Sequence, residues 1–312
     1  MTDSSAAELL AAARAGSPRA LARLISWIED GSPRLGELAR LITGPDTARV
    51  IGLTGAPGVG KSTTTNALVG ALRATGQRVA VLAVDPSSPF SGGALLGDRV
   101  RMTEHAADPG VYIRSMASRG HLGGLAAAAP MAIRLLEAVG FDAILVETVG
   151  VGQSEVEIAG EADSTVVLLA PGMGDGIQAA KAGLLEVGDV YVVNKADRDG
   201  AEAVRRDLRS MIGLTERAAH DWRPPIVMAV ALDKRGIDEL VEALAAHREW
   251  AQSSGAFLSK RRERARREIS ALAWARLQQG WAGWSGIETL AASVAAGELD
   301  VYTAVDRLLA AR

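Results

Sequence analysis

Length, composition and charge describe an ordinary globular protein and exclude several classes. The chain has 312 residues, of which 48% are hydrophobic and 23% charged, and its formal net charge is −3. This balance supports a sizeable core and gives no reason to expect nucleic acid or an anionic membrane as a partner. The absence of cysteine excludes disulfides and thiolate metal sites. No apolar run approaches the roughly 20 residues that cross a bilayer, and no secretory signal is evident, so we expect a cytoplasmic protein.

Residues 1–48 are expected to form a helical extension at the N-terminus. Ser17-Pro18 is typical of a helix cap followed by a first turn. Apolar residues then recur at helical spacing from Leu21 to Ile28. Gly31-Ser32-Pro33 should end that helix, and another is expected over Leu35–Ile42. We predict that this extension packs on the main domain.

Residues 49–250 are expected to form the main domain, because short apolar segments alternate there with helical ones. The segments are β-branched on successive residues, which is typical of a parallel sheet covered on both faces. The alternation predicts a three-layer α/β domain with a mostly parallel sheet. The predicted strands are Val50–Leu53, Val79–Val84, Ala143–Val146, Thr165–Ala170, Val190–Val193 and Ile226–Val230.

Residues 251–312 are expected to form a C-terminal helical extension after a joint at Ala251–Gly255. Its basic run, Lys260–Glu268, predicts a solvated helix face, with a docking surface for an acidic partner as the alternative. The apolar positions between Leu299 and Leu309 indicate a final amphipathic helix. This extension could complete a helical subdomain or serve as a dimerisation element.

A phosphate-binding motif, G-x-x-x-x-G-K-[ST], organises the main domain. It follows the predicted strand Val50–Leu53 and opens a predicted helix over Lys61–Ala74, as the motif requires. Glycines let backbone N–H groups turn toward phosphate oxygens, and the helix N-terminus favours the same anion. Lys61 should reach the β- and γ-phosphates and Ser62 should hold Mg²⁺. The expected nucleotide-binding residues of this loop are Gly55, Ala56, Pro57, Gly58, Val59, Gly60, Lys61, Ser62 and Thr63, in a domain of the P-loop NTPase type.

A second motif indicates guanine. Asn194-Lys195-Ala196-Asp197 has the form N-K-x-D and follows the predicted strand Val190–Val193. Asp197 can accept two hydrogen bonds from guanine, whereas adenine would leave it badly paired. Asn194 should tie the base loop to the phosphate loop, and the Lys195 stem should cover one face of the ring. The backbone N–H of Ala231 should reach guanine O6, with Val230 and Leu232 beside it; Val230 lacks the hydroxyl that usually braces this loop.

Acidic residues after two other strands are expected to serve Mg²⁺ and catalysis. Asp85 should close the strand Val79–Val84 and begin a Pro-, Ser- and Gly-rich stretch that also carries Asp98, which suits a switch segment. Glu147 should end the strand Ala143–Val146, where P-loop proteins usually hold Mg²⁺ through an Asp. We assign metal binding to Ser62, Asp85, Asp98 and Glu147, and catalysis to Lys61, Asp85, Asp98 and Glu147.

The stretch after Glu147 should sense the γ-phosphate. Gly150 is expected to donate its N–H to that phosphate. Many GTPases carry a water-orienting glutamine at the next position, but here it is Val151, and Gln153 is only a fallback. We therefore expect slow GTP hydrolysis in the absence of a partner.

Several runs together resemble the MeaB/ArgK family of P-loop GTPases over essentially the whole chain. They are Asp85-Pro86-Ser87-Ser88, Leu96-Gly97-Asp98-Arg99, Arg119-Gly120-His121-Leu122-Gly123-Gly124, Glu147–Glu155 and Pro171–Asp175. The resemblance implies a Mg²⁺-dependent GTPase that is homodimeric through its C-terminal extension. It also implies a chaperone of the adenosylcobalamin enzyme methylmalonyl-CoA mutase, gating cofactor loading and protecting the mutase, and we predict no cobalamin bound directly by this chain. A third switch is implied at Gly172–Lys181, and the residues expected to respond to nucleotide or partner are Gln153, Asp175, Gln178 and Lys181.

Two alternatives remain open at this stage. One is a GTP-dependent metallochaperone, although the four histidines are scattered and no cysteine is present. The other is a transport-associated NTPase or kinase for basic amino acids. That kinase would need a catalytic base and an acceptor pocket, and no candidate pocket shows in the sequence.

Overall fold

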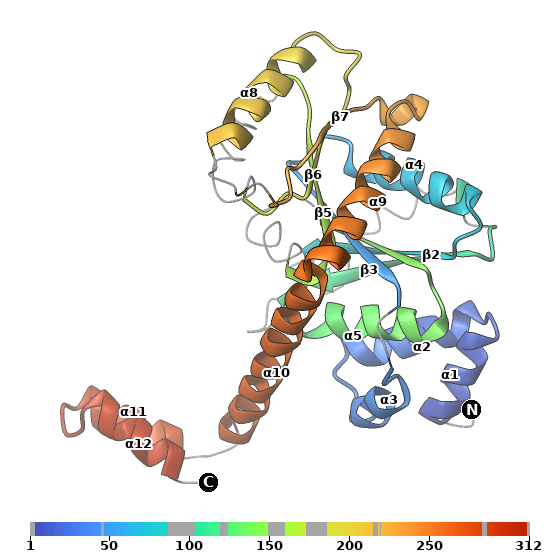
Figure 1. The fold of residues 1–312 in the computed structure, drawn as a ribbon. Helices are drawn as coiled ribbons and strands as arrows, with labels where there is room; N and C mark the ends of the chain where they lie inside the picture. Colours follow the sequence, from blue (N-terminus) through green and yellow to red (C-terminus); the bar gives the residue numbers. More distant parts are fainter. Residues whose placement is uncertain are drawn as a thin grey trace. The chain divides into compact units, whose positions relative to one another are not determined.

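Figure 1 shows a computed structural model of the chain, which describes residues 4–44, 47–86, 104–105, 107–118, 124–148, 160–172, 186–214, 218, 220–282 and 286–310. The chain forms two compact units, Met1–Ala265 and Arg266–Arg312. The first unit contains the sheet and the second is helical. Within the described ranges, no helix combines the length and apolar character needed to span a bilayer.

The described strands of the first unit form one seven-stranded sheet in the order β3-β2-β4-β1-β5-β6-β7, and every neighbouring pair is parallel. All six predicted strands are present, and their ends differ from the prediction by at most two residues. A seventh, β3, lies at the edge and was missed because it carries Arg114 and Ser115 and its residues before Met116 are only half-buried. The strands are β1 Arg49–Thr54, β2 Val79–Pro86, β3 Val111–Ser118, β4 Ala143–Thr148, β5 Ser164–Leu169, β6 Val190–Val193 and β7 Ile226–Met228.

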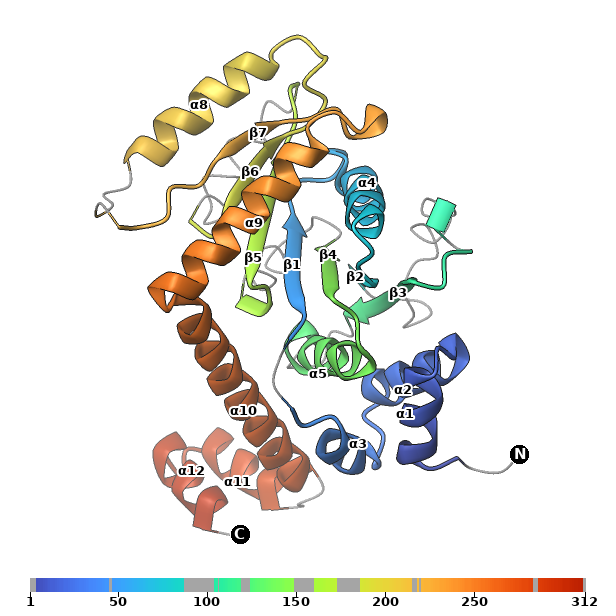
Figure 2. The same cartoon turned by 45° about the vertical axis from the view of Figure 1, so that its right-hand side comes forward.

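Helices cover both faces of this sheet, which confirms the predicted three-layer architecture (Figure 2). Because side chains alternate along a strand, Ile51 of β1 packs with α4 (Lys61–Ala74) and α9 (Ile237–Ser254), whereas Val50 packs with α5 (Gly124–Val139). On the same face as α5, α8 (Ala201–Leu214) packs on β5 and β6. The carboxyl end of the sheet is thereby left for the loops that follow the strands.

The N-terminal extension consists of α1 (Ala6–Arg14), α2 (Pro18–Glu29) and α3 (Leu35–Leu41). As predicted, Ser17 caps α2, with Pro18 in its first turn. Leu24 and Ile25 are 0% exposed and share one core with α5 and the sheet. The extension therefore packs on the main domain as expected.

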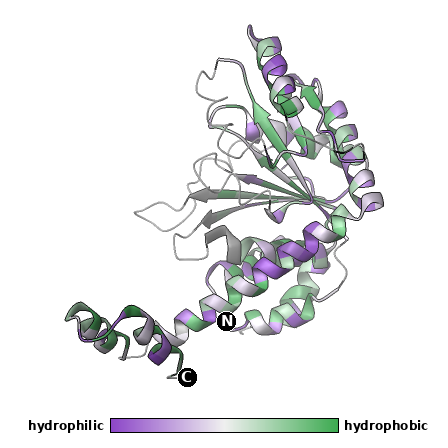
Figure 3. Cartoon of the chain, turned by 60° about the vertical axis from the view of Figure 1, so that its left-hand side comes forward, coloured by the Kyte–Doolittle hydropathy of each residue, from purple (hydrophilic) through white to green (hydrophobic). Residues whose placement is uncertain are grey.

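A break between two helices lies at Gly255, within the segment Ala251–Gly255 where the sequence predicts a joint. Helix α9 continues to Ser254, and Gly255, with φ of 80°, separates it from α10 (Ala256–Ala282). The first unit includes the opening turns of α10 and ends at Ala265. The second unit contains the rest of α10 with α11 (Gly286–Ala295) and α12 (Val301–Ala310). Hydrophilic residues occur along most of α10 (Figure 3).

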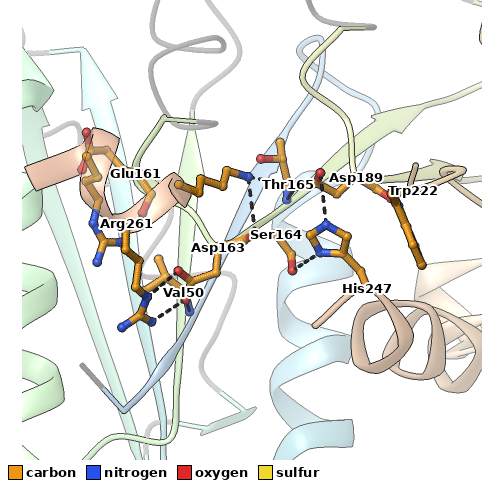
Figure 4. Close-up of polar contacts among 11 residues, drawn as sticks. Val50, Glu161, Asp163, Ser164, Thr165, Asp189, Trp222, His247 and Arg261 are labelled. Atoms are coloured by element: carbon orange, nitrogen blue, oxygen red, sulfur yellow. Dashed lines mark hydrogen bonds and ion pairs between the residues drawn. The ribbon is translucent and has the colours of Figure 1, made fainter. Parts of the chain in front are cut away.

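The basic run at the start of α10 is buried in part, so the predicted solvated face is wrong for several of its residues. Arg261 donates to both carboxylate oxygens of Asp163, from Nε at 3.0 Å and from Nη2 at 2.8 Å (Figure 4). Its Nη2 also donates to the Ala48 carbonyl at 2.9 Å. Arg264 is 5% exposed and donates to the Glu161 carbonyl at 2.8 Å. Arg262 alone of these three is solvated as predicted.

Asp189, directly before β6, links α9 and α10 to the amino-terminal ends of the strands (the amino edge of the sheet), where Asp163 also lies. Its Oδ2 accepts from the Thr165 N–H at 2.8 Å and from Lys260 Nζ at 3.1 Å. His247 Nε2 lies 3.3 Å from its Oδ1. Burial acts to raise the pKa of Asp189, but the hydrogen bond from His247 and the charge of Lys260 outweigh it and hold the pKa below its usual value. Paired charged side chains therefore cover the amino edge of the sheet.

Candidate functional site

The phosphate loop connects β1 to α4 at the carboxyl end of the sheet, as predicted. Gly55 has φ of 144°, and a Cβ there would lie 2.3 Å from the Leu168 carbonyl oxygen. Gly60 has φ of 98°, and its Cβ would lie 2.3 Å from Asn194 Nδ2. Both positions demand glycine because a side chain would meet a fixed neighbour. The loop is thereby packed against the loop that carries the guanine motif.

Lys61 begins α4 and turns back over the phosphate loop. Its Nζ donates to the carbonyls of Gly55 at 2.6 Å and Ala56 at 3.1 Å, and the residue is 7% exposed. A buried ammonium held by carbonyl oxygens places a positive charge within the loop. A bound triphosphate would neutralise the charge of this ammonium.

Ser62, Thr65 and Glu147 form a hydroxyl–carboxylate cluster beside the loop. The Ser62 hydroxyl donates to Glu147 Oε1 at 2.6 Å, and the Thr65 hydroxyl lies 2.9 Å from Glu147 Oε2. Glu147 is 4% exposed and lies within β4 rather than just after it. The donor set consists of hard oxygens, which suit Mg²⁺. Ser62 Oγ can keep a lone pair for the metal while its O–H donates to Glu147, so these residues fit that ion.

Asn194 ties the guanine motif to the phosphate loop, as the sequence predicted. Its Nδ2 donates to the Val59 carbonyl at 2.9 Å, and its Oδ1 accepts from the Ala231 N–H at 3.0 Å. Lys195 has φ of 56° and donates from Nζ to the Gly58 carbonyl at 2.7 Å. Asp197 is exposed at the end of the same turn. The two motifs, more than a hundred residues apart in sequence, therefore lie in one site.

The third loop of the site, which carries Val230, is braced without the hydroxyl that this residue lacks. The Val230 N–H donates to the Arg235 carbonyl at 3.0 Å, and these two residues form an antiparallel bridge. Gly236, with φ of 78°, closes the loop where a Cβ would lie 2.2 Å from the Met228 carbonyl. The Ala231 N–H, expected to reach guanine O6, here donates to Asn194. Leu232 beside it is 83% exposed.

Several predicted site residues lie outside the described residues. These are Asp98, Gly150, Gln153, Asp175, Gln178 and Lys181. The backbone of Asp85 lies within β2, and its side chain is not described. The assignments of these residues to metal binding, catalysis or switching therefore stay predictions.

Sequence reasoning missed Thr65. The signal was present, since Thr65 follows Ser62 by three residues on a predicted helix and must share its face.

A second group of side chains, Ser164, His247 and Asp189, has the residue types of a catalytic triad, but its serine and histidine are buried. Ser164 Oγ lies 2.8 Å from His247 Nδ1 and Asp189 Oδ1 lies 3.3 Å from Nε2, so the two ring nitrogens have the opposite partners from those in a hydrolase triad. Ser164 is also only 1% exposed and His247 3%. Within the ranges that the structure describes, no three His, Asp or Glu side chains gather as a metal-binding group.

The parallel sheet, the glycine-rich phosphate loop and the adjoining guanine motif define a P-loop GTPase. The family model described as "Methylmalonyl Co-A mutase-associated GTPase MeaB" matches residues 21–283. The chain belongs to this family, the MeaB/ArgK GTPases, as its motifs predicted.

Relatives and a solved structure agree with that membership. A Pyrococcus abyssi protein named as a GTPase is 44% identical over 97% of this chain and 95% of its own length. GTPase ArgK of Escherichia coli is 40% identical over 78% of this chain and 76% of its own. The mouse "Methylmalonic aciduria type A homolog, mitochondrial" is 38% identical over 79% of this chain and 64% of its own. The crystal structure described as LAO/AO transport system kinase has 28% identity, a TM-score of 0.71, and coverage of 99% of this chain and 97% of its own.

Proposed function

We propose that this GTPase binds GTP and Mg²⁺ at the site formed by the three loops, and that it serves as a chaperone of an adenosylcobalamin-dependent acyl-CoA mutase of the methylmalonyl-CoA mutase type. The observation that carries the nucleotide site is the pair of hydrogen bonds from the Asn194 carboxamide, one to the phosphate loop and one to the Ala231 loop. The mutase partner is supported by the description of the family whose model matches the chain.

Each described residue has a definite task in this proposal. The backbone N–H groups of the phosphate loop hold the phosphates. Lys61 exchanges its carbonyl acceptors for the β- and γ-phosphate oxygens. Asp197 pairs with the guanine edge while Lys195 covers the ring. Ser62 and Glu147 would hold Mg²⁺, which would supply positive charge to the phosphate oxygens. The protein thus contributes orientation and electrostatic stabilisation.

The remaining predicted residues complete the proposal from outside the described ranges. Asp85 and Asp98 serve the metal and the attacking water, and Gly150 senses the γ-phosphate. No glutamine follows Gly150, so hydrolysis is slow until the partner acts on the switch residues Gln153, Asp175, Gln178 and Lys181. In this cycle the mutase controls GTP turnover, and the bound nucleotide controls whether cofactor is loaded.

We also propose that the second unit mediates a homodimer. Several large apolar side chains of that unit are exposed, which is costly in water and typical of an interaction surface. Trp274 is 52% exposed, with its ring centroid 6.0 Å from that of Trp281. The other exposed large apolar side chains of the described part of this unit are Ile269, Leu272, Ile287, Val301, Tyr302, Val305 and Leu309.

The decisive experiment measures GTP hydrolysis by the full chain with and without methylmalonyl-CoA mutase, with ATP run in parallel. We expect slow GTP turnover that rises when the mutase is added, and little ATP turnover. An unchanged rate and no co-elution with the mutase would refute the chaperone role while leaving the GTPase intact. Transfer of phosphate to arginine or ornithine would instead support the transport-kinase alternative.

A further inference from the structure

The buried Thr65 side chain contacts the carboxylate of Glu147, to which metal binding is assigned. It lies in α4 one turn after Ser62, and it is 0% exposed. Its hydroxyl has two acceptors in reach, the Lys61 carbonyl at 3.0 Å and Glu147 Oε2 at 2.9 Å. A hydroxyl has one proton, and a carboxylate is the stronger acceptor. We propose that Thr65 is a positioning residue that fixes the Glu147 carboxylate for Mg²⁺, an inference that rests on the proposed nucleotide site.

The length of the Glu147 side chain explains why a second contact is needed. Glutamate has one more rotatable bond than the aspartate usual at this position, so a single hydrogen bond leaves its carboxylate plane free to turn. Ser62 holds Oε1 and Thr65 holds Oε2, and both donors come from one face of α4. With both oxygens held, Oε1 keeps accepting the hydrogen bond from the Ser62 hydroxyl, and a lone pair of Ser62 Oγ would stay directed at the metal. Releasing Oε2 would loosen this arrangement without touching the nucleotide.

The neighbouring Thr64 provides a matched control. It is also 0% exposed, and its hydroxyl donates to the carbonyl four residues earlier, that of Gly60, at 3.0 Å. Buried helical threonines commonly make this backbone contact. The Thr65 hydroxyl has the equivalent Lys61 carbonyl within reach, but unlike Thr64 it also has the Glu147 carboxylate as an acceptor. A comparison of Thr65→Val with Thr64→Val therefore separates the contact with the carboxylate from the loss of a buried helical hydroxyl.

The experiment measures metal affinity directly, with Mn²⁺ as a paramagnetic probe titrated into the GDP-loaded full chain. GDP affinity in EDTA is measured alongside it. We expect Thr65→Val to weaken Mn²⁺ binding by about 10- to 100-fold, as removal of outer-shell partners does, with GDP affinity in EDTA unchanged. Thr64→Val should leave Mn²⁺ affinity as in the unaltered protein. Thr65→Ser, which keeps the hydroxyl, should restore it.

Two results would overturn the inference: Mn²⁺ affinity unchanged in Thr65→Val, or an equal loss in Thr64→Val. If the valine variant does not fold, Thr65→Ala also lacks the hydroxyl and is compared with Thr64→Ala under the same criteria. Failure of the proposed nucleotide site has a different signature, because the unaltered protein would then bind no GDP even in EDTA. That result would refute the site itself and this inference with it.

Discussion

Replacing Arg261 by alanine should destabilise the first unit strongly. Asp163 is 7% exposed and receives two hydrogen bonds from the Arg261 guanidinium, while Glu137, 8% exposed, lies 3.8 Å from the same Nη2. Removing one partner of a buried ion pair leaves an uncompensated charge and costs about 3–5 kcal/mol. We take the lower end, about 3 kcal/mol, because Asp163 keeps the hydrogen bond from the Val50 N–H at 3.0 Å. For a unit of this size, the melting temperature should fall by about 6–12 °C.

Urea unfolding followed by circular dichroism measures this loss. Arg262→Ala is the control, because Arg262 is an exposed arginine on the same helical turn, and it should change stability by no more than about 0.5 kcal/mol. Arg261→Met combined with Asp163→Asn removes the charge of Asp163 together with that of its partner, and should recover part of the loss, since Glu137 keeps its charge. Equal stabilities for Arg261→Ala and Arg262→Ala would refute the reasoning.

Three further predictions concern the site and the sheet edge. Gly236→Ala should weaken GDP binding, because its Cβ would lie 2.2 Å from the Met228 carbonyl and displace the Ala231 loop; Gly255→Ala, with a similar φ of 80° and no atom within 4 Å, should leave GDP affinity unchanged in fluorescence titration. Asp197→Asn should weaken GTP about tenfold or more relative to xanthosine triphosphate, and equal loss of both nucleotides would contradict the guanine assignment. The lowered pKa of Asp189 means that its charged form stabilises the fold above the unfolded pKa of about 3.9 and that this contribution disappears as pH falls through the lower folded value. Asp189→Asn should therefore lower the urea midpoint at pH 7 and reduce its dependence on pH below about 4, whereas an unchanged acid limb would show that Asp189 is not responsible.

The nucleotide site was predictable because its signals are local. The spacing of Gly55, Gly60 and Lys61 fixes a loop and a helix start, and α4 begins and ends at the predicted residues, Lys61 and Ala74. The guanine motif likewise follows its strand directly. Strand ends were less accurate, since the apolar run does not mark the last hydrogen bond of a ladder. Edge strand β3 was missed for a related reason, because a strand buried on one side lacks a continuous apolar run.

Contacts between distant segments were not predictable from spacing. The basic run at the start of α10 has the charge pattern of a solvated helix, and only its partners show otherwise. Asp163 precedes Arg261 by 98 residues, and Asp189 precedes Lys260 by 71. Charge patterning describes one helix and carries no information on which sheet edge that helix meets. The bracing of the Val230 loop is of the same kind, since it depends on the backbone of Arg235 and the turn at Gly236.

The acids at the amino edge are there because the strands require them. The first N–H groups of a strand point away from the ladder at a buried edge and need acceptors. Asp163 Oδ2 accepts from the Val50 N–H of β1, and Asp189 Oδ2 from the Thr165 N–H of β5. A leucine at either place would leave a buried donor without a partner, at a cost of about 1–3 kcal/mol. The buried acids in turn require cations, which α10 supplies through Arg261 and Lys260. Asp163→Asn is therefore the substitution to combine with Arg261→Met, because asparagine keeps an acceptor oxygen for the Val50 N–H. An apolar replacement of Asp163 should not restore stability, because it removes that acceptor.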